Sequence, residues 1–239
     1  MNCMYKSEVQ DDCQTCRWRT SRFFCGVSGT ALRHLQRIAA LEFHPAGAVL
    51  YAEAQLPKGV YILCNGRAKI STTSSRGKII ILKIAQPGEV LGLGAALAQR
   101  PHEETATLLD SCQLKFIPKR ELSSYLSGNA SASLKSALQV NGDCDAAREQ
   151  IRRISSSISG RQKLAQLLIS WNHEASFHDD SQGVVPVPYT HEEIAQMIGS
   201  TRETVTRALN RFRKERAIEV RSGTFMVKDL KRLAQFGGD

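Results

Sequence analysis

The chain has 239 residues, enough for two domains with separate cores, and a formal net charge of +9, which favours an anionic partner. Its start, MNCMYKSEVQDD, lacks the apolar stretch of a secretory signal, and no apolar run approaches the roughly 20 residues of a membrane span. We therefore expect a cytoplasmic protein with no membrane segment.

Cysteines crowd the N-terminal segment 1–30. Four of the seven, Cys3, Cys13, Cys16 and Cys25, lie within the first 25 residues. An odd number of cysteines in a cytoplasmic chain argues against a disulfide framework. Thiolates bind iron–sulfur clusters and zinc, so Cys13, Cys16 and Cys25 are candidate metal ligands. Reduced thiols without a metal are the third interpretation, and the sequence leaves all three open.

Short strands between turn signals follow, from residue 41 to about residue 122. Segments such as GVYILCNGRAKI and GKIIILKIAQPGEVLGL combine β-branched or aromatic residues with glycine and proline. Residues 60–64, VYILC, alternate in the two-residue period of a strand. This spacing predicts a closed or rolled antiparallel β domain, which we place at residues 31–128.

A heptad-like apolar repeat comes next, in steps of three and four residues. Charged residues surround it, which indicates a long helix at 129–158 whose seam joins two copies of the chain. A helix packed only on its own β domain is the alternative. The predicted seam consists of Ala137, Val140, Cys144, Ala147, Ile151, Ile154 and Ile158.

Two consecutive helix-start signals follow in the C-terminal part. Thr190 and Glu193 have the spacing of a capping box, in which a hydroxyl and a carboxylate cap each other's backbone. Gly199 ends that helix, and Ser200 with Glu203 repeats the signature at the next one. Two short helices joined by a turn that contains glycine form a helix-turn-helix.

The flanking segments complete this second domain, residues 159–239. AIEVRSGTFMVKD predicts a hairpin with Ser222-Gly223 as its turn, which would stand beside the helix-turn-helix as a wing. HEASFHDDSQG, residues 173–183, is predicted as a loop, and VVPVPY as a short extended edge segment.

The second helix of the motif, residues 201–214, separates an apolar side from a polar side. Arginine can pair with guanine, and glutamate can accept from the N4 amino group of cytosine, whereas cations nearby suit phosphates. A solvated helix with ordinary ion pairs is the alternative. We expect base contacts from Arg202, Glu203, Thr206 and Arg207, and phosphate contacts from Ser200, Thr201, Arg211, Arg213 and Lys214.

The segment EEIAQMIGSTRETVTRALNRF resembles the DNA-binding motif of the Crp/Fnr family, the cyclic AMP receptor proteins and their relatives. YILCNGRAKI and QPGEVLGL are similar to turns of that family's β-roll. The resemblance implies an α+β fold with an N-terminal antiparallel, cyclic-nucleotide-binding-like β-roll, a long dimerisation helix and a C-terminal winged helix-turn-helix. It also implies a homodimeric transcriptional regulator that reads a palindromic operator with half-sites similar to TGTGA, and that contacts RNA polymerase if it activates.

The predicted effector pocket departs from the family pattern. Cyclic AMP binders hold the phosphate with an Arg-Ser pair, whereas His102, Glu103 and Glu104 stand near that position here. Carboxylates beside a phosphate are unfavourable, so we do not expect cyclic AMP to bind, and the effector stays open. The candidate pocket residues are Gly88, Glu89, Arg100, Glu103, Glu104 and Thr105.

The cysteines match the Fnr-type oxygen sensors of the family only in part. Cys13 and Cys16 have the spacing of two cluster ligands, but the interval to Cys25 is longer than in those proteins. Lys115 stands where they have a barrel cysteine, and Cys112 lies three residues before it. The resemblance therefore leaves an iron–sulfur or thiol-based redox sensor as one alternative.

Other function classes find less support. The chain has no Gly-rich P-loop, Gly-x-Ser-x-Gly or His-Glu-x-x-His motif, so we do not expect an enzyme. A nucleotide-binding module that acts on a protein partner has no use for Arg202, Glu203 and Arg207 on one exposed helix end. The sequence therefore favours a DNA-binding regulator.

Overall fold

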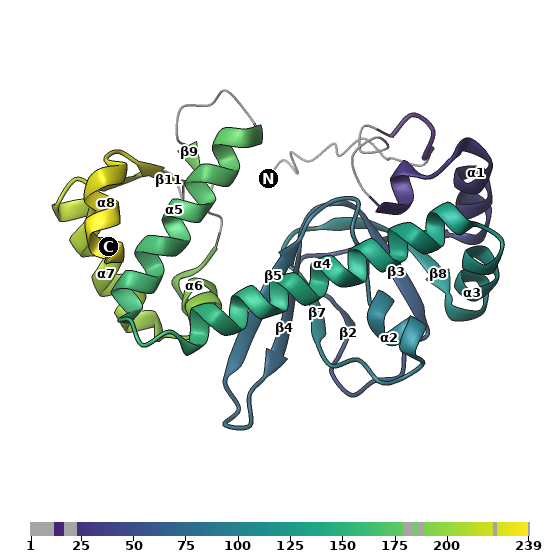
Figure 1. Cartoon of the computed structure of the whole chain (residues 1–239), viewed down its shortest axis with the longest axis horizontal. Coiled ribbons are helices and arrows are strands. Elements are labelled where there is room, and N and C mark those ends of the chain that lie inside the picture. Colours follow the sequence, from purple (N-terminus) through teal and green to yellow (C-terminus); the bar gives the residue numbers. More distant parts are fainter. Residues whose placement is uncertain (1–11, 17–22, 179–183, 186–188, 222–223, 239) are drawn as a thin grey trace, which may run out of the picture. The chain divides into compact units, whose positions relative to one another are not determined.

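The protein folds into two compact units, Met1–Ala147 and Arg148–Asp239 (Figure 1). The first holds the antiparallel sheets and the second the helix-turn-helix, so the predicted α+β fold is confirmed. Within the described residues no helix combines the length and apolarity that crossing a bilayer requires. The computed structural model describes residues 12–16, 23–178, 184–185, 189–221 and 224–238.

Two four-stranded antiparallel sheets build the β-roll. Their strand orders are β1-β8-β3-β6 and β2-β7-β4-β5. Because side chains of a strand alternate in direction, strands of both sheets send apolar residues into a shared core, where Leu63 and Ala106 are completely buried. The strands are β1 (Ala40–His44), β2 (Val49–Tyr51), β3 (Gly59–Asn65), β4 (Ala68–Thr73), β5 (Ile79–Ala85), β6 (Val90–Leu91), β7 (Thr105–Leu108) and β8 (Cys112–Pro118).

The N-terminal segment is part of the same unit. A short 3-10 helix, η1 (Phe23–Gly26), precedes α1 (Gly29–Ile38), and α3 (Lys119–Ser127) follows the last strand. Phe24 is fully buried and meets Tyr125 of α3 edge to face at 5.9 Å. The boundary that we predicted at residue 30 therefore falls inside α1, because η1 and α1 complete the core of the roll.

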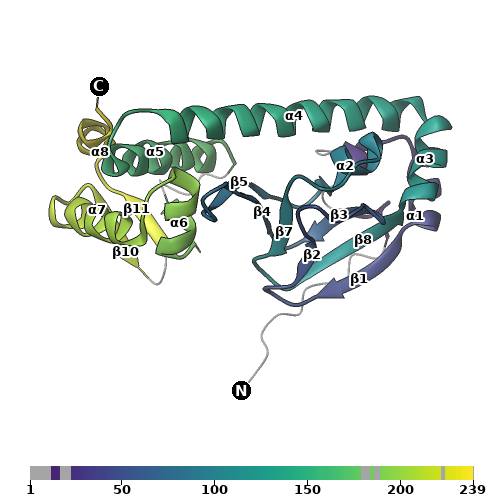
Figure 2. The same cartoon turned by 90° about the horizontal axis from the view of Figure 1, so that it is seen from below.

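The long helix α4 (Ala130–Ser155) begins as predicted and ends three residues early, so Ile158 lies beyond it. A run of serines explains this end, since Ser155 and Ser156 donate their hydroxyls to backbone carbonyls of the preceding turn. Short helix α2 (Leu93–Ala98) belongs to the roll, as Figure 2 shows.

The second unit contains the remaining elements: α5 (Gly160–His178), β9 (Val184–Val185), α6 (His191–Ile198), α7 (Arg202–Lys214), β10 (Ile218–Arg221), β11 (Thr224–Val227) and α8 (Leu230–Gly237). The predicted hairpin is confirmed as β10 and β11, with β9 on the other side of β11. Its turn, Ser222-Gly223, lies outside the described residues. The predicted loop 173–183 is wrong at its start, because no glycine or proline interrupts α5 before His178.

Candidate nucleic-acid interface and sensor cavities

Capping residues fix the start of both helices in the helix-turn-helix. The predicted capping box is present: the Thr190 hydroxyl accepts from the Glu193 backbone and the Glu193 carboxylate accepts from the Thr190 backbone. Gly199 ends α6 with a φ of +64°, a conformation that favours glycine. The cap of α7 is Thr201 and not the predicted Ser200, since the Thr201 hydroxyl accepts from the Thr204 backbone.

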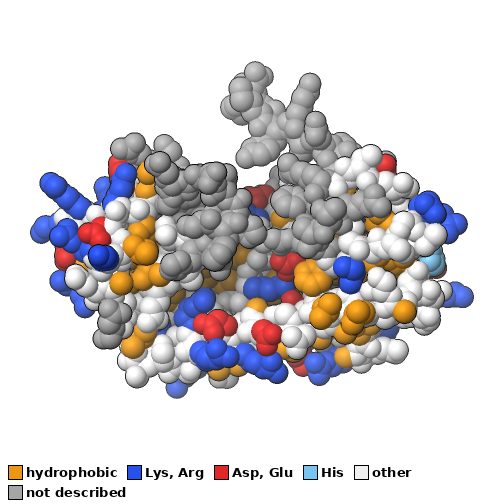
Figure 3. All heavy atoms as spheres, turned by 45° about the horizontal axis from the view of Figure 1, so that its top comes forward, with side chains coloured by type: hydrophobic (Ala, Val, Ile, Leu, Met, Phe, Trp, Pro, Cys, Tyr) orange, Lys and Arg blue, Asp and Glu red, His pale blue; other side chains and the backbone are white. Residues whose placement is uncertain are grey.

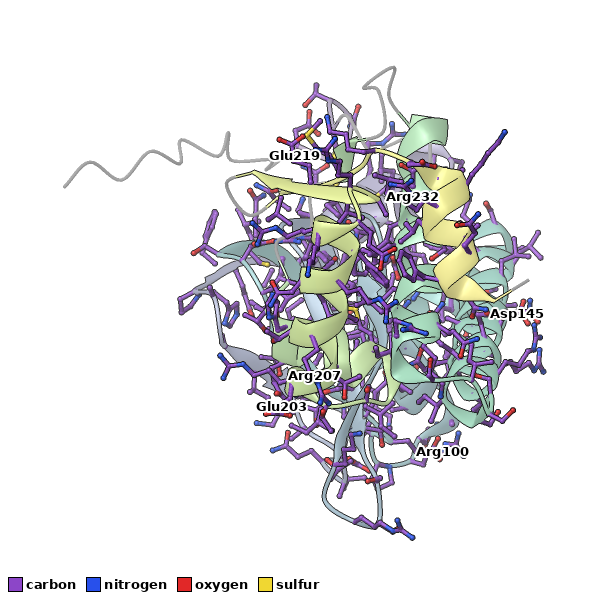
Figure 4. The ribbon with its side chains drawn as sticks, turned by 90° about the vertical axis from the view of Figure 1, so that its left-hand side faces the viewer. Arg100, Asp145, Glu203, Arg207, Glu219 and Arg232 are labelled. Carbon is purple, nitrogen blue, oxygen red and sulfur yellow. The ribbon has the colours of Figure 1, made fainter. Side chains whose placement is uncertain are left out.

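Helix α7 has the two sides that its sequence predicts. Val205, Ala208, Leu209 and Phe212 are buried, whereas Arg202, Glu203, Arg207 and Asn210 are exposed. Figure 4 shows Glu203 and Arg207 close together near the same end of α7. A backbone N–H at the helix start and the Thr201 hydroxyl lower the pKa of Glu203, which keeps it an ionised acceptor. This side of the helix can therefore offer both donors and an acceptor to base edges.

The predicted base contact Thr206 is already engaged within the chain. Its hydroxyl bonds to the Arg202 carbonyl at 2.9 Å and to Nδ1 of His191 at 2.8 Å. Thr206 therefore joins α7 to the start of α6 and sets their spacing. Sequence reasoning missed His191, because a contact across 15 residues leaves no periodic signal.

The predicted phosphate contacts separate into two groups. Arg213 and Lys214 are exposed at the C-terminal end of α7. Figure 3 shows Lys and Arg side chains projecting at the left of the view. Arg211 instead pairs with Glu215 at 3.0 Å. Ser200 faces α5, because a Cβ at Gly160 would come within 2.5 Å of its hydroxyl oxygen. Arg213 and Lys214 therefore suit phosphate contacts better than Arg211, which a carboxylate already holds, or Ser200, which has no charge.

A cavity of about 310 Å³ in the β-roll, which we call the effector cavity, contains part of the predicted pocket. Arg100, Glu103 and Glu104 line it. Gly88 borders a different cavity, and Thr105 accepts a hydrogen bond from the Glu53 backbone. The lining residues that sequence reasoning missed come from distant parts of the chain: Tyr51, Lys83 and Asp143.

Lys83 and Arg100 are the cations that line the effector cavity, and two carboxylates hold Lys83. It pairs with Glu89 and with Asp143 of α4. Burial disfavours its charge, but the two carboxylates outweigh this effect and raise the pKa of Lys83. Gln139 strengthens the same attachment, since its side-chain amide exchanges hydrogen bonds with the backbone N–H and carbonyl of Val90. We call these contacts of Asp143 and Gln139 the α4 clasp.

A second group of polar side chains also lines the cavity. The Tyr51 hydroxyl donates to Glu104 at 3.1 Å, and burial raises the pKa of the Glu104 carboxyl. The His102 ring stacks on Tyr51 at 3.9 Å, and burial lowers its pKa, which favours the neutral ring. Its Nδ1 has no hydrogen-bond partner within the described part of the chain.

Four cysteines, Cys13, Cys16, Cys25 and Cys64, line a second, small cavity of about 20 Å³ together with Lys115. We call these four the thiol cluster. The Lys115 ammonium donates to Cys13 Sγ at 3.1 Å. The structure thus brings the three predicted cysteines together and adds Cys64 of β3, which sequence reasoning treated as an ordinary strand residue.

The thiol cluster has the right donors for an iron–sulfur or zinc site but not the arrangement. Among the residues that the structure describes, no three His, Cys, Asp or Glu side chains are placed to hold one metal ion. Burial, with the neighbouring thiols, raises the pKa of Cys25 and of Cys64 to about 12, so both favour the thiol form. As placed, the Lys115 ammonium contacts Cys13 and lines the same cavity as the four cysteines.

Two domain families match the chain. Residues 41–129 match the cyclic nucleotide-binding domain, and residues 162–236 match the Crp-like helix-turn-helix domain. The first match covers the strands of the β-roll, and the second runs from α5 to α8.

Whole proteins with both parts are also similar. A CRP-like cAMP-activated global transcriptional regulator of Mycobacterium tuberculosis is 24% identical over 219 residues, which cover 89% of this chain and 94% of that protein. The transcriptional regulator SdrP of Thermus thermophilus is 26% identical over 199 residues, 82% of this chain and 92% of SdrP. The structure of FixK2 from Bradyrhizobium japonicum shares the fold, with a TM-score of 0.71 and 17% identity over 84% of this chain and 98% of that one.

Proposed function

The chain belongs to the Crp/Fnr family of DNA-binding transcriptional regulators, and on this premise we propose that it reads a palindromic operator as a homodimer under the control of its β-roll. The exposed side of α7 is the observation that carries this proposal. Arg202, Glu203 and Arg207 project there from a helix whose other side is buried. Such a helix can enter the major groove with its N-terminal residues at the bases.

Selection from a random pool of DNA duplexes tests the proposed readout. We expect the purified protein to enrich a palindrome with half-sites similar to TGTGA, because a two-fold dimer presents two identical helices about one DNA turn apart. Enrichment of no palindrome would contradict it and favour a regulatory module that acts on a protein partner. Contact with RNA polymerase is expected only if the bound protein activates transcription.

The dimer is proposed to form along one side of α4. Ala137 and Cys144 border an apolar groove with Leu97 of α2, and Ile151 is 65% exposed. Val140 instead packs against the core of the roll, as our alternative interpretation predicted. Apolar side chains this exposed gain the most from association with a second copy.

Cyclic AMP is not the proposed effector. Both cations that line the cavity already face carboxylates: Lys83 pairs with Glu89 and Asp143, and Arg100 pairs with Glu103. Glu104 adds further negative charge, which disfavours a cyclic phosphate. We expect titration calorimetry to detect no binding of cyclic AMP at micromolar concentration. A micromolar dissociation constant would contradict the proposal.

A thiol-based redox signal is the input that we propose in its place. The thiol cluster supports it, because four cysteines and a cation share one cavity in the sensor unit. We expect the double variant Cys13→Ser, Cys16→Ser to change the affinity for the operator under oxidising or reducing conditions. Wild-type affinity of this variant under both conditions would contradict it.

A further inference from the structure

Cys13 and Cys16 sit in one short turn. Asp12 begins the turn: its carboxylate accepts from the Gln14 backbone at 2.8 Å, and its carbonyl accepts from the Thr15 hydroxyl. The Cys-x-x-Cys spacing is the one that redox-active disulfides of oxidoreductases use. Both side chains are half-buried and line the same cavity. This shared cavity and spacing make the pair a candidate for a disulfide.

Lys115 connects this pair to the β-roll. It lies on β8, is 3% exposed, and donates to Cys13 Sγ. Closing the disulfide brings Cys13 Sγ to about 2.05 Å from Cys16 Sγ, which moves the acceptor of this hydrogen bond. Oxidation of Cys13 therefore weakens one of the contacts of the buried Lys115 ammonium, which destabilises the β-roll around Lys115.

This inference rests on the proposed redox control. We propose that Cys13 and Cys16 form a reversible disulfide without a metal, with a hydroperoxide as oxidant. Lys115 transmits the formation of this disulfide to the β-roll. The Cys13 sulfur attacks one peroxide oxygen, the O–O bond breaks, and an alcohol (or water) leaves with a proton. The Cys16 sulfur then attacks the resulting sulfenic acid, the S–O bond breaks, and water leaves. Two thiols and one hydroperoxide thus give one disulfide, one alcohol and one water.

The effect can reach α4 through packed side chains. Cys13 and Cys25 pack against the core that contains Phe24 and Tyr125, and the same core contains Ala132 at the start of α4. Cys25 and Cys64 line the same cavity but belong to η1 and β3, outside the Cys13–Cys16 turn. We expect them to stay reduced when the first pair closes.

Intact mass, with peptide mapping after alkylation, tests the disulfide in the full chain treated with hydrogen peroxide. Wild type, Cys64→Ser and Cys144→Ser, a control outside the thiol cluster, should each lose the mass of two hydrogens and regain it with dithiothreitol. Cys13→Ser and Cys16→Ser should not. Lys115→Met should slow the reaction about tenfold, the factor for losing one charge-assisted hydrogen bond, and Lys115→Arg should restore most of it.

Two results would overturn the inference. One is a disulfide that maps to Cys25 or Cys64 in the wild type. The other is stoichiometric iron or zinc in protein purified without oxygen, if Cys64→Ser removes it. Operator binding by the reduced wild type is measured separately, so failure of the proposed DNA-binding function is distinguishable from failure of the disulfide.

Discussion

Arg207 and Lys214 lie on the same helix but are expected to act differently on DNA. Arg207 is exposed one turn after Glu203, in the part of α7 that a major groove would receive, whereas Lys214 is the last residue of the helix. A bidentate contact to a base specifies sequence, and a contact to phosphate only positions the protein. The two residues therefore make a matched pair for testing readout.

We expect Arg207→Ala to cost about 1–3 kcal/mol on the selected operator and to relax the preference at one base pair per half-site. Lys214→Ala should weaken binding to all sequences alike and reduce its dependence on salt. Binding titrations on the operator and on single-base variants measure both. If Arg207→Ala lost the same affinity for every DNA sequence, Arg207 would not contact a base that specifies the operator.

Glu104 gives a prediction for stability against pH. Because burial raises its pKa above the usual 4.5, the folded chain holds this proton more tightly than the unfolded chain does. The contribution of this group to the free energy of unfolding therefore falls as pH rises from the unfolded pKa through the folded pKa. Glu104→Gln should raise the stability at neutral pH relative to mildly acidic pH. Urea unfolding of both proteins in the two buffers measures the difference, and equal pH slopes would contradict it.

At the scale of residues, the position of a side chain around its helix explains which exposed residues could be predicted from the sequence. The exposed position of Arg207 follows from its place opposite Val205, Leu209 and Phe212, which one helix determines alone. Cys64 and Lys83 could not be found in this way. Their partners come from other strands and from α4, and no local period records contacts across such distances.

At the scale of elements, the start of α6 depends on one capping residue. Thr190 satisfies a backbone N–H that the helix itself leaves without a partner. Thr190→Ala should cost about 0.5–2 kcal/mol in the free energy of unfolding. Thermal and urea unfolding followed by circular dichroism check it, with Lys231→Ala on the surface of α8 as control. A loss no larger than that of the control would contradict the role of the cap.

The helix α4 shows where element prediction stops. Its apolar repeat predicted the helix and its N-terminal end, and a serine run explains why Ile158 is left out. The repeat could not tell which members face the chain itself. Val140 packs on the roll and Ile154 against Gly199, whereas Ile151 is exposed. A seven-residue period predicts an apolar face on a helix, but it does not predict which part of the protein, or which second copy, packs against each part of that face.

At the scale of the whole molecule, the proposed dimer can be tested on the exposed edge of that stripe. Cys144→Asp with Ile151→Asp would bring like charges together across the two-fold axis, so we expect monomers and loss of operator binding. Sedimentation velocity measures the change. Ile154 is left intact, because it contacts the position of Gly199 within the same unit.

A control for this test lies on the same helix. Leu134 and Leu138 are 63% and 59% exposed on another side of α4. Leu134→Asp with Leu138→Asp should leave the dimer intact. The reverse result, monomers from this pair and a dimer from the first, would place the interface on the other side of α4.

The order of parts along the chain was predictable from local signals, because strand alternation, a heptad stripe and the capped helices of the helix-turn-helix each occupy their own stretch. The union of the N-terminal segment with the roll was not. It depends on Phe24 meeting Tyr125, a contact between parts of the chain about 100 residues apart.

The α4 clasp limits what any small molecule in the effector cavity can do. Asp143 and Gln139 already hold α4 to the roll through the chain's own contacts. A ligand that binds the closed and open populations equally shifts neither, whatever its affinity. A ligand that takes the place of Asp143 at Lys83 must open the clasp, so its apparent affinity falls in proportion to the fraction of molecules in which the clasp is already open. In terms of conformational populations, such a ligand can only release α4, never recruit it.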